Sequence, residues 1–436
     1  MLSLGCRLIA AAFLMLKLIV REILMAETRN LRMDNAKAIL IILVVIGHFL
    51  LPIKGSTQVC TNLFYVIYTF HMVAFTFLSG LFAQGVYKYR GDKMFFNWRK
   101  WFKILWLYLI YEIITFFSEI PAYGRTTGIP DLLRENGAPW YLMALLLWFL
   151  FIPLFSRARD KYICINGDDG YSGLDDVDHI RIIGADEIAD YKGINISLGF
   201  LSWIGILIFS LATGYIKGVG DFLSLDRVTA FAPCFFAGYF IGPKRMEQFL
   251  SGESRRRDHG RAGESRRRET FAQGRGLRLL KYIMLFIGVI SVVLIARFTT
   301  KYFMPYNNIV YGLWYSRLGF EELFVMYPDT VYIAPWILRL IWYIVAGSMT
   351  VLLLQLMPCG EIPVLTNIGQ RTLQIYVLHR PVRDLMLAAD VITSVDPANM
   401  LQLTYLILLS VVLTVFLASD IFTVLFKVLL YPFRKK

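Results

Sequence analysis

Three ionisable residues share one face of the first long apolar segment, which reads NAKAILIILVVIGHF over residues 35–49. Lys37 and His48 are eleven residues apart, nearly a whole number of helical turns, so their side chains share a face about 16 Å apart along the axis. Asp34 falls within about 40° of that stripe. Imidazole suits general acid–base or nucleophilic chemistry near neutral pH. The pattern predicts a helix face that leads a long, anionic-headed molecule from Asp34 and Lys37 to His48.

Histidine is rare in this chain, and its placement makes the imidazoles candidates for catalysis. Three of the five histidines, His48, His71 and His379, fall in apolar segments. Ionisable groups inside a membrane are costly and usually functional, although a histidine can also hydrogen-bond between helices. For Lys37 the structural alternative is a side chain that extends along the helix to place its charge in water. The shared face with Lys37 favours the functional interpretation of His48.

The elements that position these residues are predicted from composition. Of the 436 residues, 57% are hydrophobic and 18% are charged, below the roughly 25% charged residues of a soluble domain. Apolar runs of about 17–25 residues recur, the length that crosses a bilayer as a helix. We predict an all-α fold, a polytopic transmembrane helical bundle with about ten core spans. They lie near residues 36–51, 62–83, 102–120, 138–155, 196–216, 228–243, 280–298, 331–357, 372–390 and 401–430.

Basic residues alternate between the segments that join these spans. Residues 84–101 carry five Lys or Arg and residues 244–279 carry eleven, whereas the loops predicted on the opposite side carry at most two each. Because basic loops stay in the cytoplasm, both ends of the ten-span core are predicted to be cytoplasmic. We expect a multi-pass protein of the plasma (cytoplasmic) membrane, in contact with lipid.

The domain prediction is one membrane domain, residues 31–430, between an N-terminal extension (1–30) and a basic cytoplasmic tail (431–436). Within the extension, the apolar stretch 7–20 is short for a span and is interrupted by a lysine. Either it forms an extra interfacial or spanning helix, or translation begins at Met25.

Two cytoplasmic loops differ sharply in composition. Residues 156–195 are acidic, and we expect a solvated loop there. Residues 244–279 contain GESRRR twice, at 252–257 and 263–268. A tether drawn to anionic lipid head groups fits this repeat better than nucleic-acid binding, because membrane spans flank it closely. No nucleic-acid partner is expected.

The motifs of soluble enzymes and metal sites are missing from the sequence. The five cysteines are scattered without a CxxC pair, so no zinc site or disulfide framework is predicted. No GxSxG, Walker or dinucleotide-binding motif occurs in the right context. We expect no metal and no permanently bound cofactor, which leaves the chemistry to ionisable groups within the spans.

Five segments, in order along the chain, carry a resemblance to a known family. They read RMDNAKAILIILVVIGH (32–48), YTFHMVAFTFLSGLF (68–82), GAPWYLMALLLWFLF (137–151), DRVTAFAPCFFAGYFIG (226–242) and NIGQRTLQIYVLHRPV (367–382). Together they resemble the acyltransferase 3 membrane proteins, especially the fucose O-acetylase branch. Many members have arginine where this chain has Lys37, and lysine keeps the charge but loses the bidentate fork.

The resemblance implies a bacterial O-acyltransferase that moves an acyl group, usually acetyl, from cytoplasmic acyl-CoA to a hydroxyl of a cell-surface or lipid-linked glycan. Acetyl-CoA would be a donor co-substrate. His48 would be catalytic, either as general base or as carrier of the acyl group. His71 and His379 match family positions and would support it.

The donor site is expected at the cytoplasmic entrance of the predicted track. Lys37 and Asp34 would stand there, with Arg99 or Lys100 from the basic 84–101 segment, and the cations would bind the coenzyme's phosphates.

The acceptor site is expected at the outer ends of two spans. Arg227 matches a family position and would orient the acceptor or an oxyanion, unless it is an interfacial anchor. Trp140 and Tyr141 would stack against a sugar ring, unless they belong to the aromatic belt that is usual at a membrane surface.

Two other functional classes compete with this interpretation. Ten spans with buried histidines also fit a proton-coupled secondary transporter, but such proteins often show paired broken helices in two repeated halves, and no such symmetry is evident. A non-catalytic scaffold would leave the stripe of Lys37 and His48 unexplained. The sequence alone names neither the acceptor glycan nor the oligomeric state.

Overall fold

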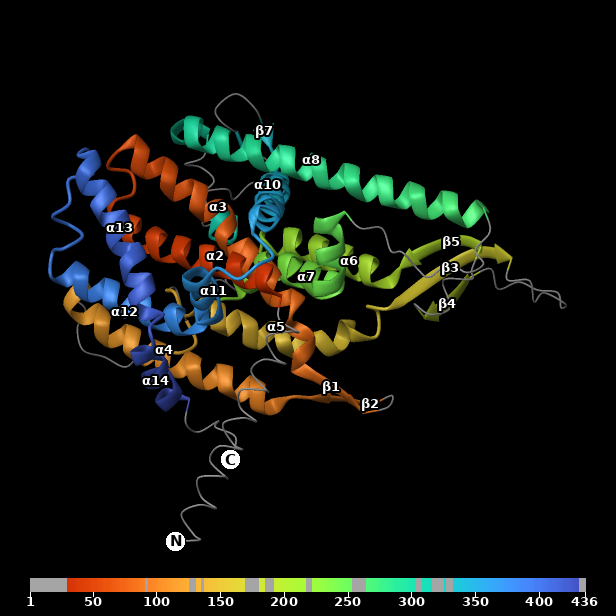
Figure 1. The fold of residues 1–436 in the computed structure, drawn as a ribbon, viewed down its shortest axis with the longest axis horizontal. Helices are drawn as coiled ribbons and strands as arrows, with labels where there is room; N and C mark the ends of the chain where they lie inside the picture. The colour runs from red at the N-terminus through yellow and green to blue at the C-terminus, as the bar shows by residue number, and fades with distance from the viewer. Residues whose placement is uncertain are drawn as a thin grey trace, which may run out of the picture.

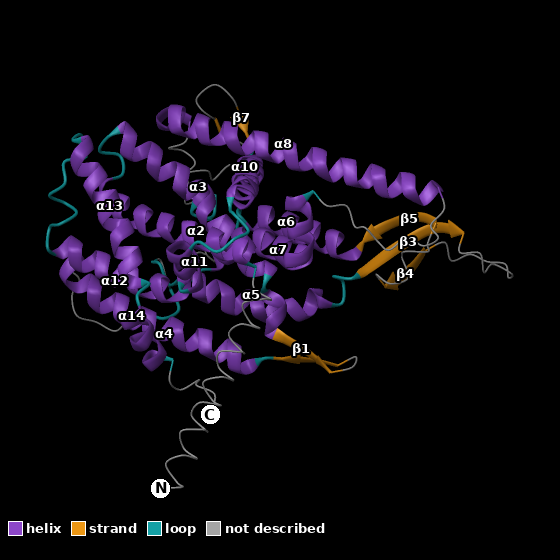
Figure 2. Cartoon of the chain, in the orientation of Figure 1, coloured by secondary structure: helices purple, strands orange, loops and turns teal. Residues whose placement is uncertain are grey.

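The prediction of an all-α polytopic bundle is confirmed by the structure, a computed structural model in which helices dominate and strands are confined to small sheets (Figures 1 and 2). The structure describes residues 30–90, 93–124, 131–134, 137–168, 180–184, 192–216, 222–252, 264–302, 307–315, 325–326 and 332–430. The predicted extension up to residue 29 and the tail 431–436 lie outside these ranges.

The helices follow the predicted spans in order along the chain. They are α2 (Leu31–Leu50), α3 (Gln58–Leu81), α4 (Trp98–Tyr123), α5 (Trp140–Ser156), α6 (Leu198–Thr213), α7 (Leu225–Ser251), α8 (Glu264–Tyr302), α9 (Asn307–Val310), α10 (Pro335–Leu356), α11 (Pro363–Gln370), α12 (Thr372–Ala388), α13 (Met400–Leu417) and α14 (Asp420–Leu429).

Within the described residues, six helices are long and apolar enough to cross a membrane, and α5 and α6 are shorter apolar helices. The six are α2 with its extension to Ile53, α3, α4, the Arg275–Arg297 part of α8, α10 and α13. The predicted spans 228–243 and 372–390 are not among them. They correspond to α7, which contains two prolines and a kink, and α12, which carries buried charges.

Local sequence explains where the helices that carry the site begin. Asn30 caps α2, where its side-chain oxygen accepts from the Met33 N–H at 3.2 Å, and Asp34 adds negative charge to the first turn. Thr57 caps α3 in the same way, with its hydroxyl 3.3 Å from the Cys60 N–H. These caps fix the start of two neighbouring antiparallel helices.

The interior of the bundle is organised around α2, which contacts α3, α11, α12 and α13. Helices α3 and α7 cross at close range. A Cβ added to Gly80 would overlap the backbone oxygen of Phe235, and one added to Gly238 would overlap that of Phe77. Small residues let membrane helices approach this closely, so the two backbones pack directly against each other.

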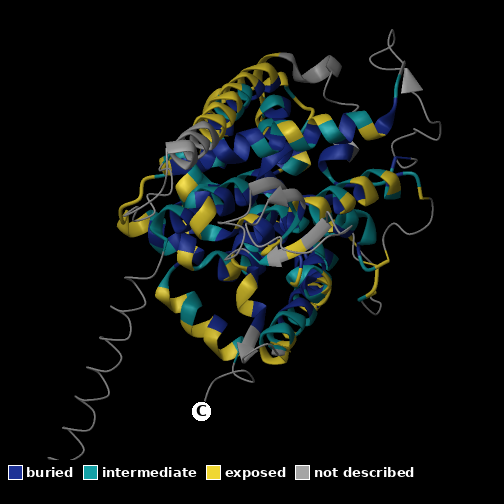
Figure 3. Cartoon of the chain, turned by 90° about the vertical axis from the view of Figure 1, so that its right-hand side faces the viewer, coloured by how far each residue is buried: buried dark blue, intermediate teal, exposed yellow. Residues whose placement is uncertain are grey.

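The outer face of the bundle carries exposed apolar side chains, as expected of a surface that meets lipid. In Figure 1, α8 runs along the top of the bundle, and Figure 3 shows buried residues inside and exposed ones on the outer helices. The exposed apolar residues of α8 include Leu277, Leu279, Leu280, Ile283, Phe286, Val289, Val293 and Leu294.

Strands form in several of the segments that join the predicted spans. Two antiparallel strands, β1 (Tyr87–Arg90) and β2 (Lys93–Phe96), precede α4. The acidic 156–195 segment, predicted as a solvated loop, contains a three-stranded antiparallel sheet of order β4-β3-β5, formed by Ile180–Gly184, Lys161–Asp168 and Lys192–Ser197. Alternating Ile residues in IRIIG and KGINIS favour these strands, whereas residues 169–179 and 185–191 of the segment lie outside the described ranges. A last pair, β6 (Val325–Met326) and β7 (Tyr332–Ile333), lies before α10.

Two further boundaries differ from the prediction. The predicted span 401–430 is two helices, because Ser419 has an extended backbone and Asp420 begins α14. At this break the Arg371 guanidinium lies 2.6 Å from the Asp420 carboxylate. The predicted loop 244–279 is helical at both ends, since α7 continues to Ser251 and α8 begins at Glu264.

Candidate active site

His48 and His379 face each other from helices that are far apart in the sequence. His48 lies in the last turn of α2 and His379 lies near the middle of α12. Their ring centroids are 5.1 Å apart, with the ring planes tilted by 50°. His379 is fully buried and His48 is half-buried. The structure thus places two of the three predicted catalytic residues side by side.

Each of these rings has a nitrogen that has no hydrogen-bond partner among the described residues. Nδ1 of His379 lies 2.8 Å from the carbonyl oxygen of Tyr376 and 3.1 Å from that of Ile375. Because a carbonyl only accepts, Nδ1 carries a proton, and the neutral ring has its lone pair on Nε2. In the part of the chain that the structure describes, Nε2 of His379 and Nδ1 of His48 are buried and have no hydrogen-bond partner. These two nitrogens can take up a proton or an acyl group.

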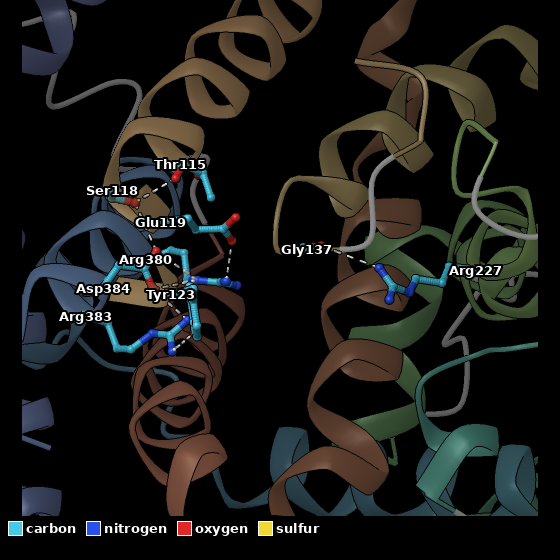
Figure 4. Close-up of polar contacts among 9 residues, drawn as sticks. All are labelled: Thr115, Ser118, Glu119, Tyr123, Gly137, Arg227, Arg380, Arg383 and Asp384. Carbon is cyan, nitrogen blue, oxygen red and sulfur yellow. Dashed lines mark hydrogen bonds and ion pairs between the residues drawn. The ribbon is translucent and has the colours of Figure 1, made fainter. Parts of the chain in front are cut away.

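A buried ionic network fixes the turn of α12 that holds His379 (Figure 4). Arg380 contacts Glu119 of α4 at 2.8 Å and Asp384 at 3.2 Å. Asp384 is also 2.8 Å from Arg383 and accepts from the Ser118 hydroxyl at 3.0 Å. Buried ion pairs hold a defined geometry when further hydrogen bonds satisfy the charges. The network therefore locks α12 against α4 next to the two histidines.

His71 reaches the histidine pair through Tyr68 rather than by direct contact. Its Nδ1 is 2.8 Å from the carbonyl oxygen of Ile67, and its ring lies edge-on to the Tyr68 ring at 4.8 Å. Tyr68 packs against α2 next to His48, because a Cβ added to Gly47 would lie 2.8 Å from Cε2 of that ring. We call His48, His71 and His379 the histidine cluster.

Lys54 extends the site beyond the end of α2. Its ammonium is 4.9 Å from the centroid of Phe64 and 3.4 Å from the hydroxyl of Tyr311. The Tyr311 ring is in turn 5.3 Å from Tyr68. Burial lowers the pKa of Lys54, since a charged ammonium loses part of its hydration there. Lys54 therefore supplies a cation on the side of the histidine cluster away from Lys37.

Arg227 and Trp140 form a contact at the start of α7 and α5. The Arg227 guanidinium lies 5.5 Å from the Trp140 ring centroid and donates to the Gly137 carbonyl at 3.5 Å. Figure 4 shows Arg227 across the view from the Arg380 network. Two of the three predicted acceptor-binding residues are therefore neighbours.

Tyr141 is connected to the histidine cluster through a second tyrosine. Its ring is 5.8 Å from Tyr376, whose ring is 6.0 Å from His379. The Tyr141 hydroxyl is already engaged, 2.5 Å from the Ser79 hydroxyl, and the residue is buried. Tyr141 is thus placed to shape the site, whereas Trp140 is the more accessible of the two aromatic residues.

The predicted donor-binding residues lie at the end of the bundle where α2 and α4 begin and α3 ends, which we call the basic end. The Lys37 ammonium is 3.2 Å from the Asp34 carboxylate and 4.7 Å from the Phe82 ring centroid. Arg99 is exposed in the first turn of α4, and Lys100 is half-buried beside it. Lys37 and His48 thus occupy opposite ends of α2, about 16 Å apart along its axis.

Four charged residues near the histidine pair were not among the predicted site residues. Arg380, Arg383 and Asp384 fall inside the predicted span 372–390, and Glu119 falls inside 102–120. Charged groups inside membrane segments are usually functional, so their position was a usable signal. The i, i+4 spacing of Arg380 and Asp384 was a readable signal of an ion pair.

Comparisons with known proteins place these observations in a family. Residues 30–423 match the acyltransferase domain of the acyltransferase 3 family, which includes every helix of the site. The chain is similar to nodulation protein NolL of Sinorhizobium fredii (strain NBRC 101917 / NGR234), with 33% identity over 145 residues, 30% of this chain. This match spans 38% of the length of NolL. No significant match to a solved structure was found. Because the family match covers nearly the whole chain, this multi-helix membrane protein belongs to the acyltransferase 3 family.

Proposed function

We propose that this membrane acyltransferase moves an acetyl group from cytoplasmic acetyl-CoA to a hydroxyl of a cell-surface or lipid-linked glycan, in the plasma membrane of a bacterium. The observation that carries the proposal is the pair of His48 and His379. Two imidazoles 5.1 Å apart, each with a buried nitrogen that has no partner in the described residues, form a site for acyl and proton transfer. Lys37 lies at the opposite end of α2, which supports a donor whose negatively charged part binds there.

Two chemical routes suit the pair, and both balance. In the direct route, an imidazole nitrogen takes the proton of the acceptor hydroxyl, the oxygen bonds to the acyl carbon, and the C–S bond breaks as the proton passes to the thiolate. In the carrier route, Nδ1 of His48 bonds to the acyl carbon, the C–S bond breaks, and the thiolate takes the proton from the other nitrogen of the His48 ring. The acceptor oxygen then bonds to the acyl carbon and the C–N bond breaks, while Nε2 of His379 accepts the hydroxyl proton and passes it back to the His48 ring.

The donor is proposed to bind with its phosphates at the basic end. Lys37, with Lys100 or Arg99, supplies positive charge there, and Asp34 orients the Lys37 ammonium through their 3.2 Å ion pair. The acyl end must then extend about 16 Å along α2 to reach His48. On this proposal the basic end faces the cytoplasm, which agrees with the excess of Lys and Arg in 84–101.

The acceptor is proposed to approach from the end of α2 beyond His48. Arg227 and Trp140 lie close together there, and Tyr141 lies behind them toward His379. An arginine fork beside a partly buried aromatic ring suits a sugar, because the ring can stack while the guanidinium donates hydrogen bonds.

The test is acetyl transfer by the purified protein without an ion gradient. We expect wild-type protein in detergent to release coenzyme A from acetyl-CoA and to label a supplied glycan acceptor, and His48→Ala to do neither. Export of a solute that requires a proton gradient, together with no turnover of acetyl-CoA by folded protein, would favour the transporter class instead. Profiling O-acetylated surface glycans in a strain that lacks the protein identifies the acceptor.

A further inference from the structure

We propose that Arg159 is a phosphate-binding residue of the donor site, together with Lys37 and Lys100, which lie near residues 82–86 at the basic end. This inference rests on the proposed function, since it assigns the phosphates to the donor coenzyme. Arg159 lies after the end of α5, outside the segments that match the family motifs quoted above.

The three cations come from different parts of the chain and meet one short segment. The Lys37 ammonium lies 4.7 Å from the Phe82 ring centroid. The Lys100 ammonium lies 3.3 Å from the position that a Cβ on Gly85 would occupy. Arg159 and the Gln84 amide flank the Cβ position of Gly242, at 2.7 and 3.3 Å. Residues 82, 85 and 84 of one short segment thus lie near Lys37, Lys100 and Arg159, respectively.

The charges at this end are not balanced within the described part of the chain. Lys37 pairs with Asp34, but neither Arg159 nor Lys100 has an ion pair among those residues. The Arg159 guanidinium packs over the Tyr239 ring at 5.3 Å, and its buried Nε has no hydrogen-bond partner among the residues that the structure describes. A buried donor on a charged group favours an anionic acceptor. A phosphate ester with several oxygens meets that requirement.

The kink in α7 makes room for this guanidinium. Gly242 has φ of +70°, which side chains rarely adopt, and Pro243 follows it. A Cβ at Gly242 would press against the Arg159 guanidinium and the Gln84 amide. The glycine therefore lets Arg159 lie between the broken helix and the 82–86 turn instead of pointing into water.

The ligand chemistry is a phosphate ester, and its source is either the donor coenzyme or a lipid head group. We assign it to the coenzyme because Lys37 belongs to the same group of cations and starts the helix face that ends at His48. A lipid head group does not deliver an acyl group to His48, so its phosphate would not need to lie on that helix face.

The test compares acetyl-CoA with acetyl-pantetheine, which lacks the phosphates. In Arg159→Met we expect the KM for acetyl-CoA to rise about tenfold to a hundredfold, as for loss of a charged hydrogen bond. Turnover of acetyl-pantetheine should stay at the wild-type level, and Arg159→Lys should recover part of the loss. Arg157→Met, two residues earlier and exposed, is the matched control and should leave both KM values unchanged.

Binding measurements separate this inference from the proposed function. Coenzyme A binding to purified protein in a phosphate-free detergent should weaken in Arg159→Met and in Gly242→Ala, whether or not acetyl transfer occurs. Unchanged coenzyme A binding in a folded Arg159→Met variant overturns the inference. So does a variant that loses binding only to phosphatidylglycerol vesicles, because the site would then serve a lipid. A wild-type protein that binds coenzyme A but transfers nothing would refute the proposed function alone.

Discussion

The two ends of α2 hold their charged side chains in opposite ways. Around the histidine cluster, Arg380 and Arg383 meet carboxylates, with Asp384 bonded by three side chains at once. At the basic end, Lys100 and Arg159 have no ion pair within the described residues. A closed network fixes positions, whereas unbalanced cations leave binding energy for a ligand. The difference suggests that one end is built for fixed chemistry and the other for a soluble anion that comes and goes.

The largest effect is expected from His48. If it is the base or the acyl carrier, His48→Ala should lower acyl transfer by roughly 100- to 10,000-fold while the protein still folds. His48→Gln should be almost as poor, because an amide cannot take up a proton usefully. The measurement is turnover of acetyl-CoA, normalised to folded protein. Near-normal turnover in His48→Gln would remove this residue from the chemistry and make His379 the first candidate.

A second large effect is expected on stability from Asp384. Asp384→Asn leaves Arg380 and Arg383 without their shared carboxylate in a buried place, which typically costs roughly 3–5 kcal/mol. The matched control is Asp420→Asn, which breaks the Arg371 ion pair at a largely exposed carboxylate and should change stability little. Thermal unfolding in detergent measures both. Equal, small shifts for the two variants would show that the network near His379 is not what holds α12 in place.

The smallest effect is expected from Lys37, and it should appear in binding only. Lys37→Met should raise the KM for acetyl-CoA about tenfold, the effect of losing one modest charged contact, while kcat stays near wild type. Lys37→Arg keeps the charge and should retain most activity. Steady-state kinetics with varied acetyl-CoA measures both constants. A normal KM in Lys37→Met would mean that the lysine only places its charge in water at the membrane surface.

Much of the fold followed from sequence because apolar length alone marks membrane helices. The helix face shared by Lys37 and His48 was predictable as well, because both residues lie in one helix and their spacing of eleven residues is nearly a whole number of turns. In two segments, local residue preferences decided the secondary structure, and apolar length did not. Ser419 and Asp420 split a predicted span in two, and isoleucine-rich stretches formed a sheet in the acidic loop.

The partner of His48 could not be derived from spacing. His379 follows it by more than three hundred residues, and no periodicity links α2 to α12. The family resemblance named His379, but only the packing of α12 against α2 and α4 brings its ring beside His48 and sets Glu119 against Arg380. Arg159 carries no motif at all, and its position depends on the kink at Gly242.

The close crossing of α3 and α7 has a mechanical consequence. With Gly80 and Gly238 in backbone contact with the facing helix, neither helix can slide or rotate past the other without a steric collision. A transporter that moves its substrate by rocking one half of the helical bundle against the other needs looser packing between helices than this. We expect the acyl group to move through a stationary frame instead, so a covalent link between α3 and α7 should not slow turnover.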